Sequence, residues 1–191
     1  MRETDRLEAF SDGVMAVIIT LMAFNVKPPA AASLSALRTD LPELLVYVLS
    51  FAIVGTYWNN HHHLLRATGR ISGGVMWTNL HLLFWLSLLP IATGWVGRFP
   101  GEAIPTAFYG VLGLATAVAY WILVRAIIRA NGRDSRVARA IRSDAKGKLS
   151  LVLYAAGAGL AFATPVAADV AYVAVAVMWF VPDRRLAPES A

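Results

Sequence analysis

Long apolar runs, each bounded by charged residues, proline or glycine, recur along this chain. The first extends from Phe10 to Val26 and ends at Lys27 and the pair Pro28 and Pro29, which cannot continue a helix. A helix needs roughly 20 predominantly apolar residues to cross the hydrocarbon core of a bilayer. The pattern is therefore typical of a membrane protein with several spanning helices.

The composition excludes the other broad classes of protein. Hydrophobic residues make up 58% of the 191 residues and charged residues only 15%, whereas a soluble domain has about 45–50% and about 25%. A disordered chain would need low hydrophobicity and high net charge. The chain has no cysteine, which excludes disulfides, thiolate metal sites and thiol catalysis.

We predict an all-α integral membrane protein, with one membrane domain over residues 1–191 and six spanning helices. The breaks in the apolar pattern place these helices at about 7–26, 41–66, 75–97, 106–129, 149–164 and 168–181. Pro90 lies inside the third, where a kink is expected. The last two are short for a span and also fit one interrupted hairpin. The start of the chain mixes acidic and basic residues, unlike a signal peptide, so we expect the first helix to be retained.

The basic residues predict the orientation. Thirteen of the 17 lysines and arginines lie on one side of the membrane in this predicted topology, and three lie on the other. The remaining one, Arg125, lies within the fourth helix. Seven of the thirteen form one loop: Arg129, Arg133, Arg136, Arg139, Arg142, Lys146 and Lys148. Because cytoplasmic loops are rich in Lys and Arg, we expect a multi-pass protein of the cell membrane with both termini cytoplasmic. Such a loop is better explained by topology or lipid headgroups than by nucleic acid, so no nucleic-acid partner is expected.

Polar residues within the apolar runs are the candidate functional residues, because they are costly in a bilayer and need partners. Asp12 lies near the start of the first helix, where it either caps the helix or has a functional role. Thr20 falls on an otherwise apolar helical face that either lines a pore or packs against a neighbour. The other members of that face are Phe10, Gly13, Val17, Leu21 and Phe24.

Histidine and asparagine form the remaining polar groups. Residues 59–63 read Asn-Asn-His-His-His at the end of the second helix, and Asn79 and His81 lie in the third. Consecutive helical side chains point about 100° apart, so the three histidines cannot form one metal face. A haem held by His63 and His81 is an alternative that no motif supports. No catalytic, nucleotide-binding or zinc motif is present, so we expect no enzyme activity, no metal and no cofactor.

The first helix resembles that of the transmembrane protein 175 family, the endosomal and lysosomal potassium channels and their prokaryotic relatives. The resemblance rests on the pattern Arg6-x-x-x-Phe10-Ser11-Asp12 and its continuation through Leu21. It extends to Trp58-Asn59-Asn60-His61-His62, to Asn79-Leu80 and to the segment from Phe84 to Pro90. It covers the first half of the chain, whereas the second half agrees only in helix count and hydropathy.

The resemblance implies six helices per chain without a pore loop, and four chains around a central pore lined by helix 1. Val17, Leu21 and Phe24 match apolar layers that narrow this pore, although Val17 is smaller and Phe24 larger than usual in the family. Thr20 would offer uncharged hydroxyls to a partly dehydrated ion, which favours a modest potassium preference. A bracket would fix helix 1 to its neighbours, formed by Arg6, Ser11 and Asp12 with Asn79 and either His61 or His62.

The predicted function is a potassium-permeable cation channel, weakly to moderately selective for potassium over sodium and gated by a hydrophobic constriction on helix 1. Its partners are the bilayer, monovalent cations and three further copies of the chain. The alternative is a proton-conducting or proton-coupled carrier. A carrier usually has repeats and broken helices at mid-membrane, whereas helix 1 has no break in its pattern.

Overall fold

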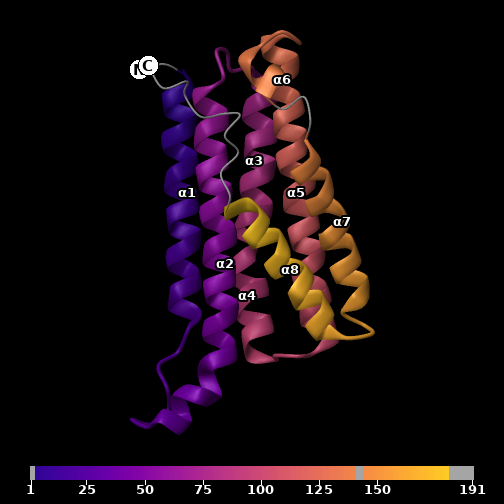
Figure 1. The fold of residues 1–191 in the computed structure, drawn as a ribbon. Helices are drawn as coiled ribbons and strands as arrows, with labels where there is room; N and C mark the ends of the chain where they lie inside the picture. Colours follow the sequence, from indigo (N-terminus) through magenta and orange to yellow (C-terminus); the bar gives the residue numbers. More distant parts are fainter. Residues whose placement is uncertain (1–2, 141–143, 181–191) are drawn as a thin grey trace.

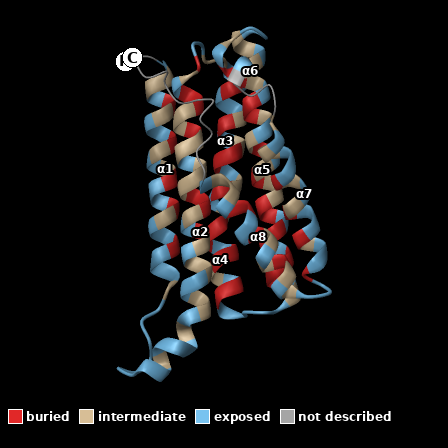
Figure 2. Ribbon diagram, in the orientation of Figure 1, coloured by how far each residue is buried: buried red, intermediate tan, exposed pale blue. Residues whose placement is uncertain are grey.

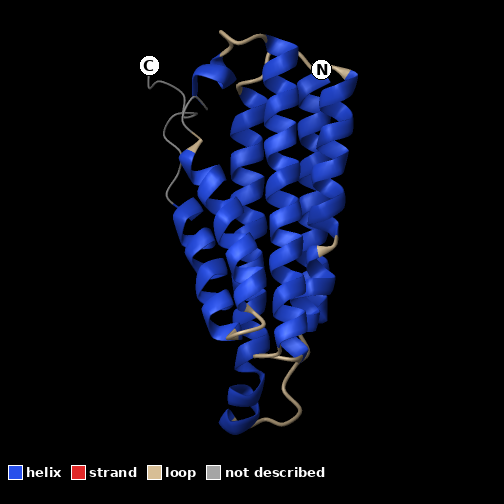
Figure 3. Cartoon of the chain, turned by 90° about the vertical axis from the view of Figure 1, so that its right-hand side faces the viewer, coloured by secondary structure: helices blue, strands red, loops and turns tan. Residues whose placement is uncertain are grey.

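The computed structural model describes residues 3–140 and 144–180, and all regular elements in these ranges are α-helices (Figures 1 and 3). They are α1 (Glu3–Asn25), α2 (Leu34–Arg66), α3 (Gly73–Ser87), α4 (Leu89–Arg98), α5 (Ala103–Asn131), α6 (Arg136–Ala140), α7 (Ala145–Leu160) and α8 (Pro165–Phe180). Several helices begin at side chains that cap their free amides. Ser33 Oγ accepts from the Ala36 amide at 3.2 Å, and Asp144 Oδ1 from the Gly147 amide at 3.0 Å.

The observed helices begin or end up to seven residues from the predicted bounds, and three of the differences have a structural reason or add an element. The second helix begins at Leu34 instead of about residue 41, because Ser33 caps it and Pro42 is accommodated inside it. The first turns of α2 bend away from the bundle (Figure 1). Pro42 lies inside α2, and a proline removes a backbone hydrogen bond and favours such a bend. The third predicted helix is divided into α3 and α4 at Leu88, because Pro90 occupies the first turn of α4. The short α6 was not predicted, and residue 181, the predicted end of the last helix, lies outside the described residues.

The helices form an elongated bundle with α3, α4 and α5 at its centre. Helix α1 packs against α2, α3 and α4, while α5 packs against α3, α4, α7 and α8. Buried positions are concentrated along the central helices, and exposed positions lie on the outer sides of the bundle (Figure 2). Many of the exposed residues are large and apolar, as expected for helices that face lipid or other subunits.

Four helical stretches are long and apolar enough to cross a bilayer: α1, α2, the stretch Gly73–Arg98 that contains α3 and α4, and α5. Helices α7 and α8 have 16 residues each. A helix of that length spans about 24 Å, which is shorter than the roughly 30 Å hydrocarbon core. The structure therefore has several apolar helices, with the last two short for a complete crossing.

Successive long helices run in opposite directions, so the start of α1, the end of α2 and the start of α3 lie together at one end of the bundle (Figure 1). The end of α5, α6 and the start of α7 lie at this same end, which we call the basic end because of its arginines and lysines. Its described basic residues are Arg6, Arg66, Arg70, Arg129, Arg133, Arg136, Arg139, Lys146 and Lys148. Lys27, Arg38 and Arg98 lie at the other end, and Arg2, Arg142, Arg184 and Arg185 lie outside the described residues.

Candidate functional site

Helix α1 is attached to the bundle along one face only. Its buried residues recur every three or four positions, which is the spacing of a single helical face: Leu7, Ser11, Met15, Ile18 and Met22. This face packs against α2, α3 and α4. The other side of α1 is therefore available to lipid or to another subunit.

The predicted pore residues lie on that other side. The exposed fraction is 56% for Val17, 50% for Leu21 and 85% for Phe24. Phe10 and Thr20 are exposed too, and the Thr20 hydroxyl donates to the Val17 carbonyl at 2.8 Å. A row of large apolar side chains with one hydroxyl thus faces away from the chain's own core. Since Thr20 uses its proton within the helix, its oxygen can still accept a hydrogen bond or contact a cation.

A chain of hydrogen bonds joins α1 to α3 and α2 near the basic end. The His61 Nε2 donates to Asn79 Oδ1 at 2.7 Å, and Asn79 Nδ2 donates to Ser11 Oγ at 2.9 Å. The Ser11 hydroxyl then donates to the Leu7 carbonyl at 2.8 Å. Because the amide oxygen of Asn79 can only accept a hydrogen bond, the proton in this contact lies on His61 Nε2. All three side chains are completely buried, so each bond lies in an apolar surrounding where its loss is costly.

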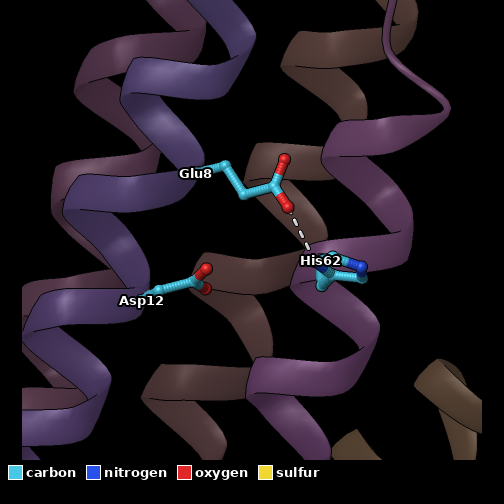
Figure 4. A group of neighbouring side chains, drawn as sticks. All are labelled: Glu8, Asp12 and His62. Carbon is cyan, nitrogen blue, oxygen red and sulfur yellow. Dashed lines mark ion pairs between the residues drawn. The ribbon is translucent and has the colours of Figure 1, made fainter.

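The remaining members of the predicted bracket lie elsewhere. Arg6 is exposed, and no hydrogen bond or ion pair joins it to Ser11, Asn79 or His61 in the described part of the chain. Asp12 lies beside Glu8 and His62 instead (Figure 4). His62 Nδ1 is 2.7 Å from Glu8 Oε1, and Arg66 Nε is 3.9 Å from the same oxygen. Of the two histidines considered for the bracket, His61 contacts Asn79 and His62 contacts Glu8.

Two further attachments of α1 were missed by the sequence reasoning. In the last turn of α1, Met22 Sδ lies 3.7 Å from the Thr93 hydroxyl. That hydroxyl is 2.8 Å from Ser50 Oγ, which in turn is 2.9 Å from the Tyr109 hydroxyl. At the end of α1, Asn25 Nδ2 donates to the Pro90 carbonyl at 3.2 Å. Thr93, Ser50 and Tyr109 are single hydroxyl-bearing residues within long apolar runs, and nothing in the local sequence indicates that they contact one another.

The histidines considered as haem ligands have other contacts. His81 Nε2 accepts a hydrogen bond from Trp85 Nε1, one turn further along α3, at 2.9 Å. The ring of His63 packs edge-on against that of His62. In the structure, the Nε2 atom of His81 is thus engaged with Trp85, and the ring of His63 with that of His62.

Comparison with known proteins identifies similar sequences. The profile of the family described as endosomal/lysosomal potassium channel TMEM175 matches residues 6–90. A protein of Chryseobacterium named a potassium channel is 46% identical over 95% of this chain and 94% of its own length. Another so named, from Streptomyces collinus, is 34% identical over 85% of this chain and 84% of its own length. A human protein named an endosomal/lysosomal proton channel is 33% identical over 46% of this chain, which matches only 20% of that longer protein.

The fold is also similar to a solved structure. The crystal structure of a homologue of the lysosomal potassium-selective channel TMEM175 from Chamaesiphon minutus superposes with a TM-score of 0.83 and 25% identity. The superposition covers 96% of this chain and 99% of that one. The similarity thus extends to the second half, where no sequence motif was found.

Proposed function

The chain belongs to the TMEM175 family, and from this we propose that it forms a potassium-permeable cation channel in the cell membrane. The observation that carries the proposal is the exposed face of α1. Val17, Leu21 and Phe24 form an apolar row that includes Thr20, and this row does not pack inside its own chain. The two bacterial relatives named potassium channels support potassium as the permeant ion.

Four copies of the chain would build the pore. One row of side chains on one helix cannot enclose a path for an ion, whereas four copies of α1 around an axis can. In this arrangement six helices cross the membrane: α1, α2, the α3–α4 stretch, α5, α7 and α8. Both termini are cytoplasmic, because the basic end carries most of the described lysines and arginines.

The gate is a hydrophobic constriction. Rings of Val17, Leu21 and Phe24 narrow the pore, and water leaves a narrow apolar segment, so that a hydrated ion cannot enter without losing its shell. A ring of Thr20 oxygens has no formal charge, so the preference for potassium over sodium is weak to moderate. Phe24, with the greatest exposed fraction of the three, closes the end of the row opposite the basic end.

Opening requires α1 to rotate or tilt so that the apolar rings separate. The contacts of Ser11, Met22 and Asn25 resist this movement, the first near the basic end of α1 and the other two near its opposite end. Of the predicted bracket, Ser11, Asn79 and His61 are part of this resistance, whereas Arg6 and Asp12 lie outside their chain of hydrogen bonds. Within it, Ser11, Asn79 and His61 fix the position of α1, and Asp12 contributes negative charge.

The protein lets ions cross the membrane and is not an enzyme, in agreement with a family described as a potassium channel. No cofactor is required, since the translocated ion is itself the substrate. The path needs only side chains that exclude or replace water around that ion.

Proton conduction is the second candidate. It is favoured by the human relative, which is named a proton channel. A constriction too narrow for a hydrated metal ion can still pass protons when a chain of water forms for a short time.

A planar-bilayer recording of the purified protein separates these functions. With potassium and sodium on opposite sides at equal pH, we expect discrete current steps and a reversal potential displaced toward the potassium equilibrium potential. A reversal potential that instead follows an imposed pH gradient would establish proton conduction. Saturable counterflow without current steps would contradict a channel.

A further inference from the structure

Two carboxylates of α1 and one imidazole of α2 meet near the basic end (Figure 4). Glu8 and Asp12 are one helical turn apart, so both point to the same side of α1. His62 faces them from α2, and one ligand atom from each of the three residues lies within 4.8 Å of the others. Side chains from two helices thus converge on one point.

The cluster contains one carboxylate oxygen without a hydrogen-bond partner in the described residues. His62 Nδ1 contacts Glu8 Oε1 at 2.7 Å, but Asp12 Oδ1 is buried and has no hydrogen-bond partner among the described residues. The guanidinium of Arg66 reaches only Glu8, at 3.9 Å, and its side chain is 69% exposed. A buried carboxylate oxygen without a partner is unfavourable, so this oxygen favours a cation beside it.

We propose that Glu8, Asp12 and His62 bind a divalent transition-metal ion, of which Zn²⁺ is the representative. Zinc binds imidazole nitrogen and carboxylate oxygen, and three protein ligands leave a fourth position for water. Magnesium and calcium prefer oxygen ligands only, so the histidine favours a transition metal over them. On binding, His62 Nδ1 and Glu8 Oε1 exchange their mutual contact for contacts with the ion.

The site is accessible without unfolding. The side chains of His62 and Glu8 are 26% and 18% exposed, so an ion can reach them from the basic end. The bound ion would link the start of α1 directly to the end of α2. The hydrogen bonds of Ser11, Asn79 and His61 link the same two helices only through α3. Bound metal would therefore hold α1 more firmly against α2.

Titration calorimetry of the purified protein in detergent tests the site, with zinc chloride and then magnesium chloride as titrant. We expect one zinc ion per chain and no binding of magnesium at the same concentrations. Glu8→Gln and His62→Gln should each weaken zinc binding by about tenfold or more, since even outer-shell substitutions at metal sites cost about 10–100-fold. Glu3→Gln, an exposed carboxylate of α1, and His63→Gln, in the same histidine run, should bind zinc as the wild type does.

Two results would overturn the proposal. One is an absence of zinc binding by the wild type, which would also appear as no increase in its melting temperature when zinc is added. The other is equal zinc affinity in the wild type, Glu8→Gln and His62→Gln, because the ion would then bind elsewhere. An absence of any zinc-dependent increase in the melting temperature of the wild type contradicts the proposal even if a variant fails to fold. Binding is measured without a membrane, so the outcome is independent of whether the protein conducts potassium.

Discussion

At the scale of single residues, the two sides of α1 differ in what a substitution would disturb. Ser11, on the packed side, accepts from Asn79 and donates to the Leu7 carbonyl, and it is completely buried. Thr20, on the exposed side, donates its hydroxyl proton to the Val17 carbonyl of its own helix. We therefore expect substitutions on the packed side to change stability, and those on the exposed side to change conduction.

Ser11→Ala should destabilise the protein by about 1–3 kcal/mol, because it leaves a buried amide donor of Asn79 without an acceptor. The change is measured as a lower melting temperature of the purified protein. Ser87→Ala is the matched control, since Ser87 is exposed and its hydroxyl donates only to the Phe84 carbonyl of its own helix. Equal melting temperatures of the two variants would contradict a role for Ser11 in attaching α1.

Thr20→Val should reduce the preference for potassium over sodium while leaving assembly intact. Valine has nearly the same shape as threonine and lacks the hydroxyl, so the pore keeps its width and loses four oxygens. The reversal potential with potassium and sodium on opposite sides measures the effect and should move toward zero. An unchanged reversal potential would remove Thr20 from the account of selectivity.

One face of α1 was predictable from local sequence. The face that contains Val17, Leu21 and Phe24 follows from helical spacing alone, and in the structure it is exposed in the single chain. Whether His61 or His62 contacts Asn79 was not predictable. That depends on how α2 is rotated about its axis relative to α3, which is decided by packing along both helices. The placement of Asp12 beside Glu8 depends in the same way on the packing of α1 against α2.

At the scale of helices, the proposed gate makes the barrier to ions depend on the length of the apolar segment of α1. Leu21→Ala should increase conductance or leak, because a smaller side chain widens the constriction and shortens the segment from which water withdraws. Single-channel recording measures the effect. Leu160→Ala is the control, since Leu160 is an exposed leucine on α7, which packs against α5 and α8 and not against α1. If both variants conducted as the wild type does, the constriction would have to lie elsewhere.

Close packing of α7 and α8 depends on particular glycines. A Cβ at Gly157 would lie 2.5 Å from the Tyr172 ring, whereas one at Gly159 would meet nothing within 4 Å. Gly157→Ala should therefore lower the stability by about 1–3 kcal/mol, and Gly159→Ala should not. Melting temperatures of the two variants provide the comparison, and a Gly157→Ala variant as stable as Gly159→Ala would contradict this packing.

The helix order was easier to predict than the helix ends. Apolar runs indicate where helices lie, but the start of α2 at Leu34 depends on a cap at Ser33 and on a proline tolerated within the helix. The break at Leu88 was expected as a kink at Pro90, and the structure divides the two helices there. The network of Thr93, Ser50 and Tyr109 joins three different helices, so no single segment of sequence contains its pattern.

At the scale of the whole molecule, the distribution of charge and apolar surface fits a membrane channel made of several chains. The basic end concentrates the arginines and lysines of α2, α5, α6 and α7. The outer side of α1 is apolar although it is exposed among the described residues of its own chain. Composition predicted the membrane setting, whereas the arrangement of four chains is a proposal that rests on family membership and on this exposed side of α1.

The central claim is that α1 lines the ion path, and modification of Leu21→Cys in a conducting channel tests it most directly. The wild-type chain contains no cysteine, so the introduced thiol is unique. We predict that a water-soluble thiol reagent reduces the single-channel current of Leu21→Cys and leaves wild-type current and that of Val152→Cys, on the outer side of α7, unchanged. A Leu21→Cys channel that conducts normally and keeps its full current after the reagent has been added would contradict the claim.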